Sequence, residues 1–399
     1  MKILIQKFGG SSVSTHERRK MSIEKILAAI KDGYVPVVVV SAMGRKGEPY
    51  ATDSLLMMLD SSFKKNNKLA VDLMMSCGEV ISTVVMCNDL FACGISCVPM
   101  TGGQAGIITD NNYGNADTIK IKTDKILEIL SKNQVPVIAG FQGESEEGFV
   151  TTLGRGGSDV TASLLGAALK AEEIQIYTDV NGIMTADPKI VSDAFLIKEI
   201  NYNEVFQFSD QGAKVIHPRA VEIAMKANIP LVIKNTLNNC KGTIINNMAA
   251  GNKNTLITGI THMNNRVQIK VTKVDNVNIE SYNEFLNDLA KNLISIDLIN
   301  VFTDEKIFTI DSEDYNKFEG IMKKLNLSYT HIDECSKIAV IGSGMRGVPG
   351  IMARILNALN NENIEVIQTA DSHTTIWCLV ESKNTVKAIK VLHKEFMSL

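Results

Sequence analysis

Short runs of apolar, mostly β-branched residues, separated by helical patterns, occupy the first two thirds of the chain. Uninterrupted runs of this kind are typical of strands that are covered on both faces of a sheet. The predicted strands are Ile3–Ile5, Val35–Val40, Val135–Ile138, Ile174–Tyr177 and Pro230–Ile233. The predicted helices between them include Met21–Lys31, Thr118–Lys132, Ser158–Lys170 and Ala213–Ala227. The alternation predicts an α/β domain in which helices sandwich a mainly parallel sheet, with ligands bound in the loops after the strands.

Composition and charge indicate a globular protein and argue against a protein that binds nucleic acid or spans a membrane. The 399 residues suffice for two or three domains, and 45% apolar with 21% charged residues is typical of a globular chain. A net charge of −3 without Lys/Arg runs argues against nucleic-acid binding. The longest apolar runs are far shorter than a membrane span, and Met1–Gln6 is predicted as a strand rather than a signal sequence. We therefore expect a cytoplasmic protein with no nucleic-acid or membrane partner.

The seven cysteines lie far apart, with no CxxC pair and no histidine at ligand spacing. This spacing argues against a zinc site. Buried thiols in a reducing compartment are the simpler interpretation.

The pattern changes after the polar stretch 246–254. Residues 267–332 are predicted to form a βαββαβ unit, and a second such pattern over 337–396 ends one strand short. Because a missing strand leaves an open sheet edge, we assign the strand Leu256–Ile260 to the second unit, so that the first unit is inserted within it. The predicted domains are residues 1–250 (the α/β domain), 263–333 (the first unit), and 255–262 plus 335–399 (the second unit).

The first glycine cluster, Lys7–Ser12, follows the first strand and opens a helix. Its glycines let backbone N–H groups approach an anion, and a lysine can neutralise charge on a transferring phosphoryl group. The cluster is not a P-loop, because GxxxxGK[ST] is absent. A tight turn after a lysine is an equally simple explanation of this cluster taken alone.

The second glycine cluster, Thr151–Asp159, also follows a strand and opens a helix. Arg155 can hold a carboxylate with a two-pronged hydrogen bond, while the glycines leave room for a ligand. Ser158 and Asp159 could instead cap the helix. Capping does not require an arginine among three glycines, so we favour a functional site.

Further polar loops are Ser41–Gly44, Thr52 with Asp53, Ser76–Glu79, Tyr177–Gly182 with Ala186–Pro188, and Gly212–Lys214. Glu79 is expected at a turn, where its carboxylate could bind an ammonium group. The loops after Tyr177 suit nucleotide contacts, and Lys214 offers a second phosphate-binding lysine. Each of these loops alone is more often a turn or a helix cap than a site.

No nucleophile–histidine pair is evident in the sequence. A carboxylate acceptor needs no general base, because it is already an anion at pH 7. Phosphoryl transfer to it depends on positioning and charge neutralisation. Lysines, glycine loops and an arginine therefore fit a kinase that acts on a carboxylate.

Several motifs, in order along the chain, resemble those of the aspartokinases in the amino-acid kinase superfamily, most closely the single-polypeptide bacterial members. They are KFGGSSV at Lys7–Val13, SAMG at Ser41–Gly44, PYATDSL at Pro49–Leu55, SCGE at Ser76–Glu79, TLGRGGSD at Thr152–Asp159, YTDVNG with ADP at Tyr177–Pro188, and GAKVIHPRA at Gly212–Ala220. Together they span most of the α/β domain, and their combination is far more specific than any single motif.

The resemblance implies phosphorylation of L-aspartate by ATP to 4-phospho-L-aspartate, the entry step to lysine, threonine, methionine and diaminopimelate. It implies that Mg²⁺ is bound with ATP, and it assigns no protein ligand to the metal. The catalytic residues that it implies are Lys7 and Asp159. The ATP-binding residues are Lys7, Phe8, Gly9, Gly10, Ser41, Thr178, Asp179, Met184, Asp187, Pro188 and Lys214. The aspartate-binding residues are Thr52, Glu79, Arg155, Gly156, Gly157 and Ser158.

The C-terminal units resemble paired ACT domains, which bind amino-acid effectors at an interface between units. Within Gly342–Ile351 the resemblance implies effector contacts from Met345, Val348, Gly350 and Ile351, although a glycine-rich helix cap would also explain the loop. The corresponding stretch of the first unit, Lys273–Asn278, has no glycine or proline and departs from the pattern. Lysine, threonine, both together or diaminopimelate could be the effector, and an interface site suggests a homodimer or larger oligomer.

Two alternatives compete with this interpretation. A kinase for another acid, such as glutamate or N-acetylglutamate, would lack the paired ACT units. An amino-acid sensor with an inactive kinase domain would not need Lys7, Arg155, Asp159 and Lys214 together.

Overall fold

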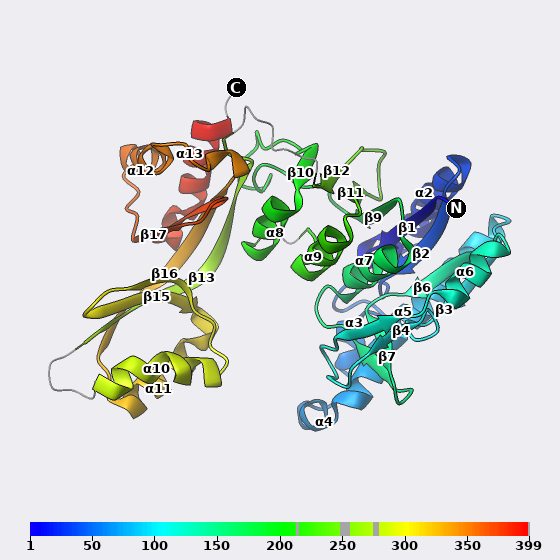
Figure 1. The fold of residues 1–399 in the computed structure, drawn as a ribbon, viewed down its shortest axis with the longest axis horizontal. Coiled ribbons are helices and arrows are strands. Elements are labelled where there is room, and N and C mark those ends of the chain that lie inside the picture. The colour runs from blue at the N-terminus through cyan, green and yellow to red at the C-terminus, as the bar shows by residue number, and fades with distance from the viewer. Residues whose placement is uncertain (213–214, 248–255, 274–278, 398–399) are drawn as a thin grey trace. The chain divides into compact units, whose positions relative to one another are not determined.

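A computed structural model describes residues 1–212, 215–247, 256–273 and 279–397 (Figure 1). The chain divides into two compact units. The N-terminal unit comprises Met1–Ile183, Leu196–Ser209 and Lys214–Ala250. The C-terminal unit comprises Met184–Phe195, Asp210–Ala213 and Gly251–Leu399. Two short segments from within residues 1–250 therefore pack with the C-terminal unit.

An eight-stranded sheet in the order β10-β12-β11-β9-β1-β2-β6-β3 forms the centre of the N-terminal unit. Its strands are β1 (Ile3–Phe8), β2 (Val35–Val40), β3 (Cys97–Met100), β6 (Val135–Ala139), β9 (Glu173–Thr178), β10 (Glu199–Asn201), β11 (Leu231–Asn235) and β12 (Thr243–Asn246). Every neighbouring pair is parallel except β11 with β12. The predicted mainly parallel sheet is thus confirmed.

Helices cover both faces of this sheet. Phe8 on one face packs in a core with Ile26 of α2 (His16–Lys31) and Met86 of α5 (Lys68–Ala92). Ile5 has the opposite orientation in β1 and lies close to α7 (Gly157–Leu169). The remaining helices of the unit are α1 (Gly10–Val13), α3 (Thr52–Leu56), α4 (Ser61–Asn66), α6 (Asp124–Ser131), α8 (Tyr202–Asp210) and α9 (Pro218–Ala227).

Helix α5 is long and apolar enough to span a membrane, with a mean hydropathy of 1.6 over its most apolar window. The sequence analysis, which considered only uninterrupted apolar runs, missed this. In the structure α5 buries Met86 and Leu90 in the core of the unit and also buries the charged Asp72 and Glu79. Only 39% of this window is buried inside the protein, and Leu73, Val84 and Phe91 of the same helix are exposed.

Three local predictions in this unit were wrong. The predicted helix Thr118–Lys132 is strand β5 (Thr118–Ile121) followed by α6, because β-branched residues at its start favour a strand. Strand β5 belongs to a second sheet in the order β5-β4-β7-β8. The predicted helix Ala213–Ala227 begins only at Pro218, where proline suits the first helical position. Ser76–Glu79 lies within α5 and not at a turn. The other strands of the second sheet are β4 (Ile107–Thr109), β7 (Gln142–Ser145) and β8 (Val150–Thr152).

The C-terminal unit contains a six-stranded antiparallel sheet in the order β14-β15-β13-β16-β18-β17. Its strands are β13 (Gly259–Thr272), β14 (Asp297–Val301), β15 (Glu305–Asp311), β16 (Tyr329–Ile341), β17 (Gln368–Asp371) and β18 (Thr375–Glu381). Its helices are α10 (Ile279–Lys291), α11 (Tyr315–Leu325), α12 (Ile351–Asn361) and α13 (Thr385–Met397). The two predicted βαββαβ repeats are confirmed as the fold of this region.

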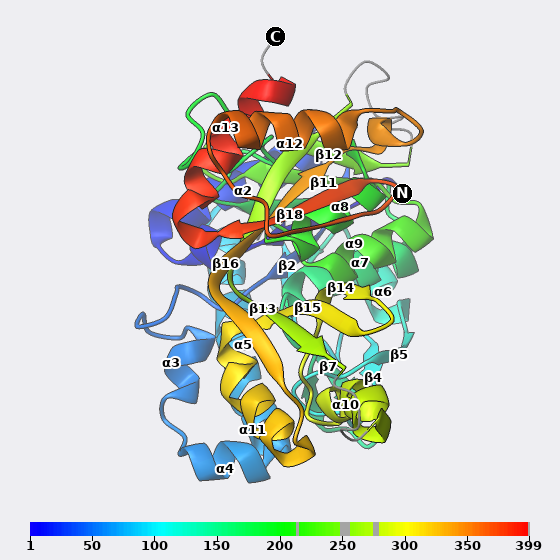
Figure 2. The same ribbon diagram turned by 90° about the vertical axis from the view of Figure 1, so that its left-hand side faces the viewer.

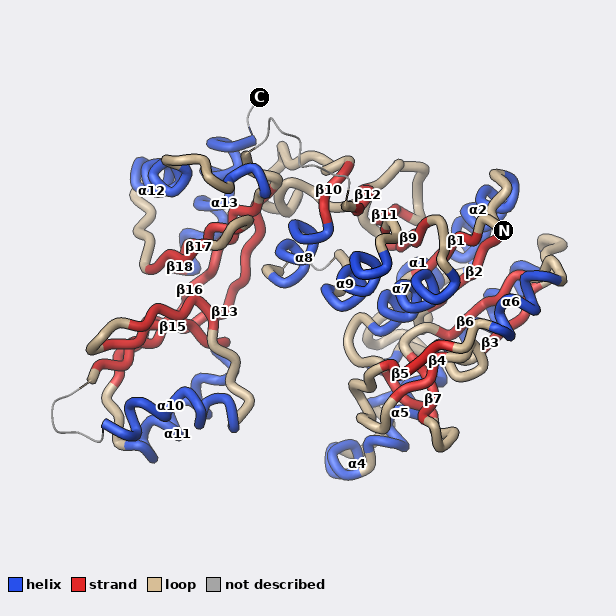
Figure 3. Tube along the Cα trace, in the orientation of Figure 1, coloured by secondary structure: helices blue, strands red, loops and turns tan. Residues whose placement is uncertain are grey.

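The two repeats share long strands that the sequence analysis treated as separate short ones. Strand β13 spans two predicted strands, and β16 does the same (Figure 2). The two strands run side by side in Figure 3. They pair from Gly259 opposite Ile341 to Val271 opposite Tyr329, with register shifts on both sides of Arg266. Each long strand therefore contributes to both repeats. The first repeat has an aromatic core around Phe285, and the second a separate aliphatic core around Ile355.

Candidate active site

The candidate site lies at the carboxyl edge of the main sheet. Strands β1, β2, β6 and β9 are parallel neighbours, so the loops that follow them meet at one edge. Backbone hydrogen bonds tie these loops together: Gly9 N donates to Tyr177 O at 3.1 Å, and Ser41 N donates to Phe8 O at 3.1 Å. The first glycine cluster is thereby placed between the loops after β2 and β9.

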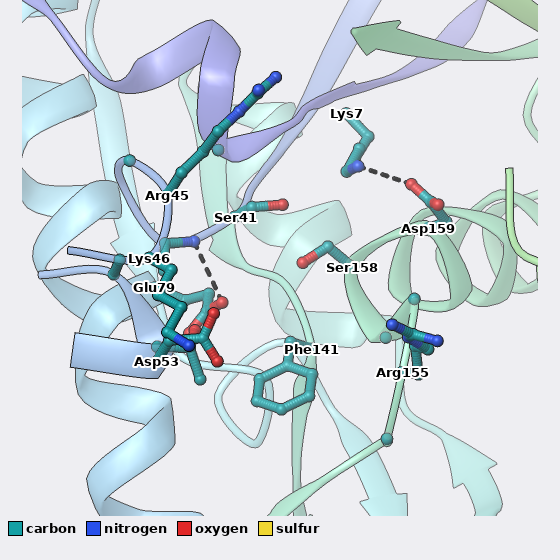
Figure 4. A pocket seen from close by; sticks show the side chains of 18 residues that line it. Lys7, Ser41, Arg45, Lys46, Asp53, Glu79, Phe141, Arg155, Ser158 and Asp159 are labelled. Carbon is teal, nitrogen blue, oxygen red and sulfur yellow. Dashed lines mark hydrogen bonds and ion pairs between the residues drawn. The ribbon is translucent and has the colours of Figure 1, made fainter. Parts of the chain in front are cut away.

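A cavity of about 330 Å³ opens at this edge (Figure 4). It is lined by Lys7, Gly10, Ser41, Ala42, Gly44, Arg45, Lys46, Ala51, Thr52, Asp53, Glu79, Phe141, Gly154, Arg155, Gly156, Gly157, Ser158 and Asp159. All six residues expected to bind aspartate, and both expected catalytic residues, line this one cavity. Arg45, Lys46, Asp53 and Phe141 are lining residues to which the sequence analysis gave no role.

An ion pair between Lys7 and Asp159 joins the two glycine clusters. Lys7 Nζ lies 2.6 Å from Asp159 Oδ1, and the two side chains are only 11% and 13% exposed (Figure 4). Lys7 is the second-last residue of strand β1, and Asp159 is in the first turn of helix α7. An ammonium held this firmly in a partly dehydrated cavity exerts a stronger field on a nearby anion than one in water.

Gly10 lets the first cluster approach the loop after β2. A Cβ atom at this position would lie 2.8 Å from Ala42 O and 2.9 Å from Gly44 O. Gly44 N also donates to Gly10 O at 3.3 Å. Any larger residue at position 10 would separate these two loops and widen the cavity.

The Arg155 loop combines an unpaired cation with a constrained backbone. Gly156 has φ +68° and precedes α7, where a side chain would also collide with His217. Arg155 is exposed, and among the described residues it makes no hydrogen bond or ion pair. Ser158, which is nearly buried, lies beside it in the cavity (Figure 4). The guanidinium is therefore available to an anionic ligand.

A buried carboxylate holds the strand that leads into this loop. Asp72 of α5 accepts hydrogen bonds from Thr152 N at 2.7 Å, Thr152 Oγ1 at 2.9 Å and Gly114 N at 2.9 Å. Burial raises the pKa of Asp72 despite these bonds. Sequence analysis missed Asp72, although a carboxylate among the apolar residues of α5 is a signal that could have been used.

Arg219 supports the same loop from the other side. It donates to Leu153 O at 3.2 Å and pairs with Asp117 at 2.8 Å. Arg219 is part of the GAKVIHPRA motif, to which the sequence analysis assigned only Lys214 a role. Lys214 itself lies outside the described residues.

Glu79 is the most perturbed acid in the cavity. Its side chain is 3% exposed, and its Oε1 accepts a hydrogen bond from Ala42 N at 3.1 Å. Oε2 has no hydrogen-bond partner in the part of the chain that the structure describes. Burial raises the pKa of Glu79 to about 8. A cationic ligand next to Oε2 would favour the ionised carboxylate.

The residues expected to contact ATP are divided between the two compact units. Asp179 follows β9 and forms an ion pair with Arg45, which lines the cavity. The Phe8 ring is fully buried and stacks on Tyr177 with centroids 4.9 Å apart, so only the backbone of Phe8 is at the edge. Met184, Asp187 and Pro188 belong to a segment that packs within the C-terminal unit.

A metal site made by protein ligands alone is not present among the described residues, where no three His, Cys, Asp or Glu side chains come together suitably. The cavity instead presents cations, namely Lys7, Arg45, Lys46 and Arg155. This set suits an anionic ligand that brings its own metal ion.

A second cavity, of about 460 Å³, lies in the C-terminal unit at the start of α12. The four residues expected to contact an effector, Met345, Val348, Gly350 and Ile351, all line it. The end of β17 and the turn after it add Asp371, Ser372 and His373, which the sequence analysis missed. In the first repeat, most of the Lys273–Asn278 stretch lies outside the described residues.

Comparison with known proteins agrees with this picture. The model of the amino acid kinase family matches residues 2–235, and that of the ACT domain matches residues 330–394. The chain is 42% identical to aspartokinase 1 of Bacillus subtilis over 99% of both chains, and 36% identical to an aspartokinase of Geobacillus stearothermophilus. The latter match covers 99% of this chain and 97% of the relative.

Solved structures share the fold. The aspartate kinase of Clostridium acetobutylicum is 25% identical, with a TM-score of 0.80 over 98% of this chain and all of the other. The structure of E. coli aspartokinase III in complex with aspartate and ADP has a TM-score of 0.82, over 99% of this chain and all of the other. At 24% identity, this second likeness concerns the fold alone.

Proposed function

The chain belongs to the aspartokinases of the amino acid kinase family and is an ATP-dependent aspartate kinase, and from this premise we propose how its residues act. The observation that carries the proposal is the Lys7–Asp159 ion pair, which joins the two glycine clusters in a cavity also lined by Arg155 and Glu79.

The aspartate would be held by both its α-carboxylate and its α-ammonium group. Arg155, which has no partner among the described residues, binds the α-carboxylate, and the buried Glu79 binds the α-ammonium group. Thr52 and Ser158 add hydroxyl groups at the cavity wall. The side-chain carboxylate is then free to face Lys7. Glutamate, which is one methylene longer, would carry its carboxylate past this position.

Lys7 would stabilise the transferring phosphoryl group in the transition state. Its ammonium, fixed by Asp159, neutralises charge that develops on the transferring group, while the backbone near Gly9 and Gly10 approaches the phosphates. No residue has to remove a proton, because the acceptor is already ionised. Thr178, Asp179, Met184, Asp187, Pro188 and Lys214 would complete the ATP site. Mg²⁺, when bound with the nucleotide, supplies charge neutralisation between its phosphates.

The second repeat would sense an end product. The cavity at Met345–Ile351 combines an apolar wall with Arg346, Asp371 and backbone polar groups, which suits a zwitterionic amino acid. Lysine, threonine or diaminopimelate would be the effector, so the enzyme would serve the biosynthesis of these amino acids in the cytoplasm. Binding at an interface between ACT units would require a homodimer or larger assembly.

A coupled assay of ADP release with aspartate, glutamate and N-acetylglutamate tests the proposed acceptor. Turnover should depend on aspartate and be far slower with the two longer acids. Rapid turnover with glutamate would contradict the assigned positions of Arg155 and Glu79. Calorimetric titration with each candidate effector would identify the one that binds.

A further inference from the structure

Helix α5 carries a buried polar stripe. Asp72, Ser76 and Glu79 are spaced four and three residues apart, so they lie on one face of the helix over two turns. Their exposed fractions are 0%, 3% and 3%, and this face is therefore turned into the protein. Each of the three residues forms a hydrogen bond with a different segment of the N-terminal unit.

The first contact holds the strand that leads to Arg155. Asp72 Oδ2 accepts hydrogen bonds from Thr152 N at 2.7 Å and from Gly114 N at 2.9 Å, and Oδ1 accepts from Thr152 Oγ1 at 2.9 Å. Thr152 ends β8, three residues before Arg155. Ala116 N in turn donates to Thr152 O at 2.8 Å. One carboxylate therefore joins α5, the loop between β4 and β5, and the end of β8.

The other two contacts hold further segments that border the substrate cavity. Ser76 O accepts a hydrogen bond at 3.1 Å from Gln142 Nε2. Gln142 is 1% exposed and directly follows Phe141, which lines the cavity. Glu79 Oε1 accepts from Ala42 N at 3.1 Å, in the loop after β2. A single helix face is thus hydrogen-bonded to three segments that form or support the wall of the cavity.

The stripe relates the two groups to which we assign aspartate recognition. Glu79 itself faces the α-ammonium group, whereas Asp72 acts on Arg155 through the backbone between them. That backbone is tightly packed, because a Cβ atom at Gly154 would lie 2.3 Å from Asn115 Oδ1. Seven residues of helix span about 10 Å, so α5 fixes the separation of its two carboxylates.

We infer that Asp72 is a positioning residue for aspartate, which holds the Arg155 loop at a set distance from Glu79. The inference rests on the proposed roles of Arg155 and Glu79. It predicts that loss of the contacts made by Asp72 raises the KM for aspartate without a matching rise in the KM for ATP.

Asp72→Ala and Thr152→Val test the inference in the full-length chain, with initial rates measured while aspartate and ATP are varied in turn. Asp72→Ala removes all three hydrogen bonds and should raise the KM for aspartate about 10-fold to 100-fold, the effect of a misplaced binding group. Thr152→Val keeps the shape of the side chain and removes one hydrogen bond, so it should raise this KM about threefold to tenfold. It also covers the case in which Asp72→Ala does not fold. If neither variant raises the KM for aspartate, the inference is wrong.

Two controls separate positioning from a loss of stability. Asp72→Asn keeps an oxygen for both N–H groups, and its amide can donate to Thr152 Oγ1, so it should retain a KM for aspartate near that of the wild type. Tyr202→Phe removes a buried hydroxyl that donates to Ile229 O in the same unit. Among the described residues, Tyr202 and Ile229 are not part of the cavity lining, so this variant should lower the Tm and leave the KM for aspartate unchanged.

Either control can overturn the inference. An equal rise in the KM for aspartate in Tyr202→Phe and Thr152→Val would mean that the effect is a general loss of stability. A KM for Asp72→Asn as high as that for Asp72→Ala would mean that Asp72 acts through its charge and not by holding the loop.

A double-mutant cycle with Arg155 shows whether Asp72 acts through it. Arg155→Ala removes the guanidinium, so adding Asp72→Ala should raise the KM for aspartate little further. Effects that multiply independently would show that Asp72 acts elsewhere and would overturn the inference. An unchanged KM for aspartate in Arg155→Ala would instead contradict the proposed function, whatever the Asp72 variants do.

Discussion

Replacing Glu79 with glutamine tests how the site recognises the ammonium group of its substrate. The change keeps the size of the side chain and the oxygen that accepts the hydrogen bond from Ala42 N. It removes only the negative charge. Because Glu79 is 3% exposed, solvent can screen the lost interaction very little.

The raised pKa of Glu79 sets the size of the effect. With a pKa of about 8, the carboxyl of the ligand-free enzyme is about 90% protonated at pH 7, so binding an ammonium group first costs about 1.4 kcal/mol for ionisation. Removing one partner of a buried ion pair costs about 3–5 kcal/mol. The net loss at pH 7 is therefore about 2–4 kcal/mol, or a fall in kcat/KM for aspartate of about 30-fold to 900-fold.

The pH dependence provides the sharper assay. In the wild type, the KM for aspartate should fall about eightfold between pH 7.0 and 8.5 as Glu79 ionises, whereas Glu79→Gln should show no such fall. Asp53→Asn, which removes an exposed carboxylate from the same cavity, should keep the wild-type slope. Equal slopes in the wild type and Glu79→Gln would refute the assignment of Glu79 to the ammonium group.

Stability gives an independent check of the same pKa. A carboxyl whose pKa rises from 4.5 to about 8 on folding makes the folded state lose stability as the pH increases through this range. The Glu79→Gln variant has no carboxyl at this position and therefore does not lose stability in this way. The difference between the Tm of ligand-free Glu79→Gln and that of the ligand-free wild type should therefore change in favour of the variant as the pH rises from 5 to 8. A constant difference in Tm would mean that Glu79 ionises freely in the folded protein.

Three further predictions concern the glycine loops and the lysine. Lys7→Ala should lower kcat by about 10²–10⁴ if the ammonium stabilises transition-state charge, and a change confined to KM would contradict that role. Gly156→Ala should destabilise the protein and weaken aspartate binding, because φ is +68° and His217 occupies the space; a Tm equal to that of wild type would show that the loop can rearrange. Gly350→Asp, in the open turn before α12, should weaken end-product inhibition in a rate assay while sparing basal activity. If inhibition is unchanged, the effector binds elsewhere.

Much of this protein follows from local sequence patterns. Continuous apolar runs such as Val35–Val40 are typical of buried parallel strands, and a glycine cluster that follows such a strand lies at the sheet edge where ligands bind. The motif order also placed Lys7, Arg155 and Asp159 in a common site before any distance was known. Their approach in the structure is the direct consequence of β1 and α7 sharing one sheet edge.

Other features depend on contacts between residues far apart in the chain, and no local pattern encodes them. Glu79 lies within a helix because the whole of α5 packs on the sheet, and its pKa comes from that burial. Asp72 meets Thr152 across 80 residues, and segment 184–195 joins the C-terminal core through His393, 208 residues beyond Thr185. Local periodicity determined the strands, helices and ligand loops, whereas tertiary packing decided which side chains lose water and which unit each loop belongs to.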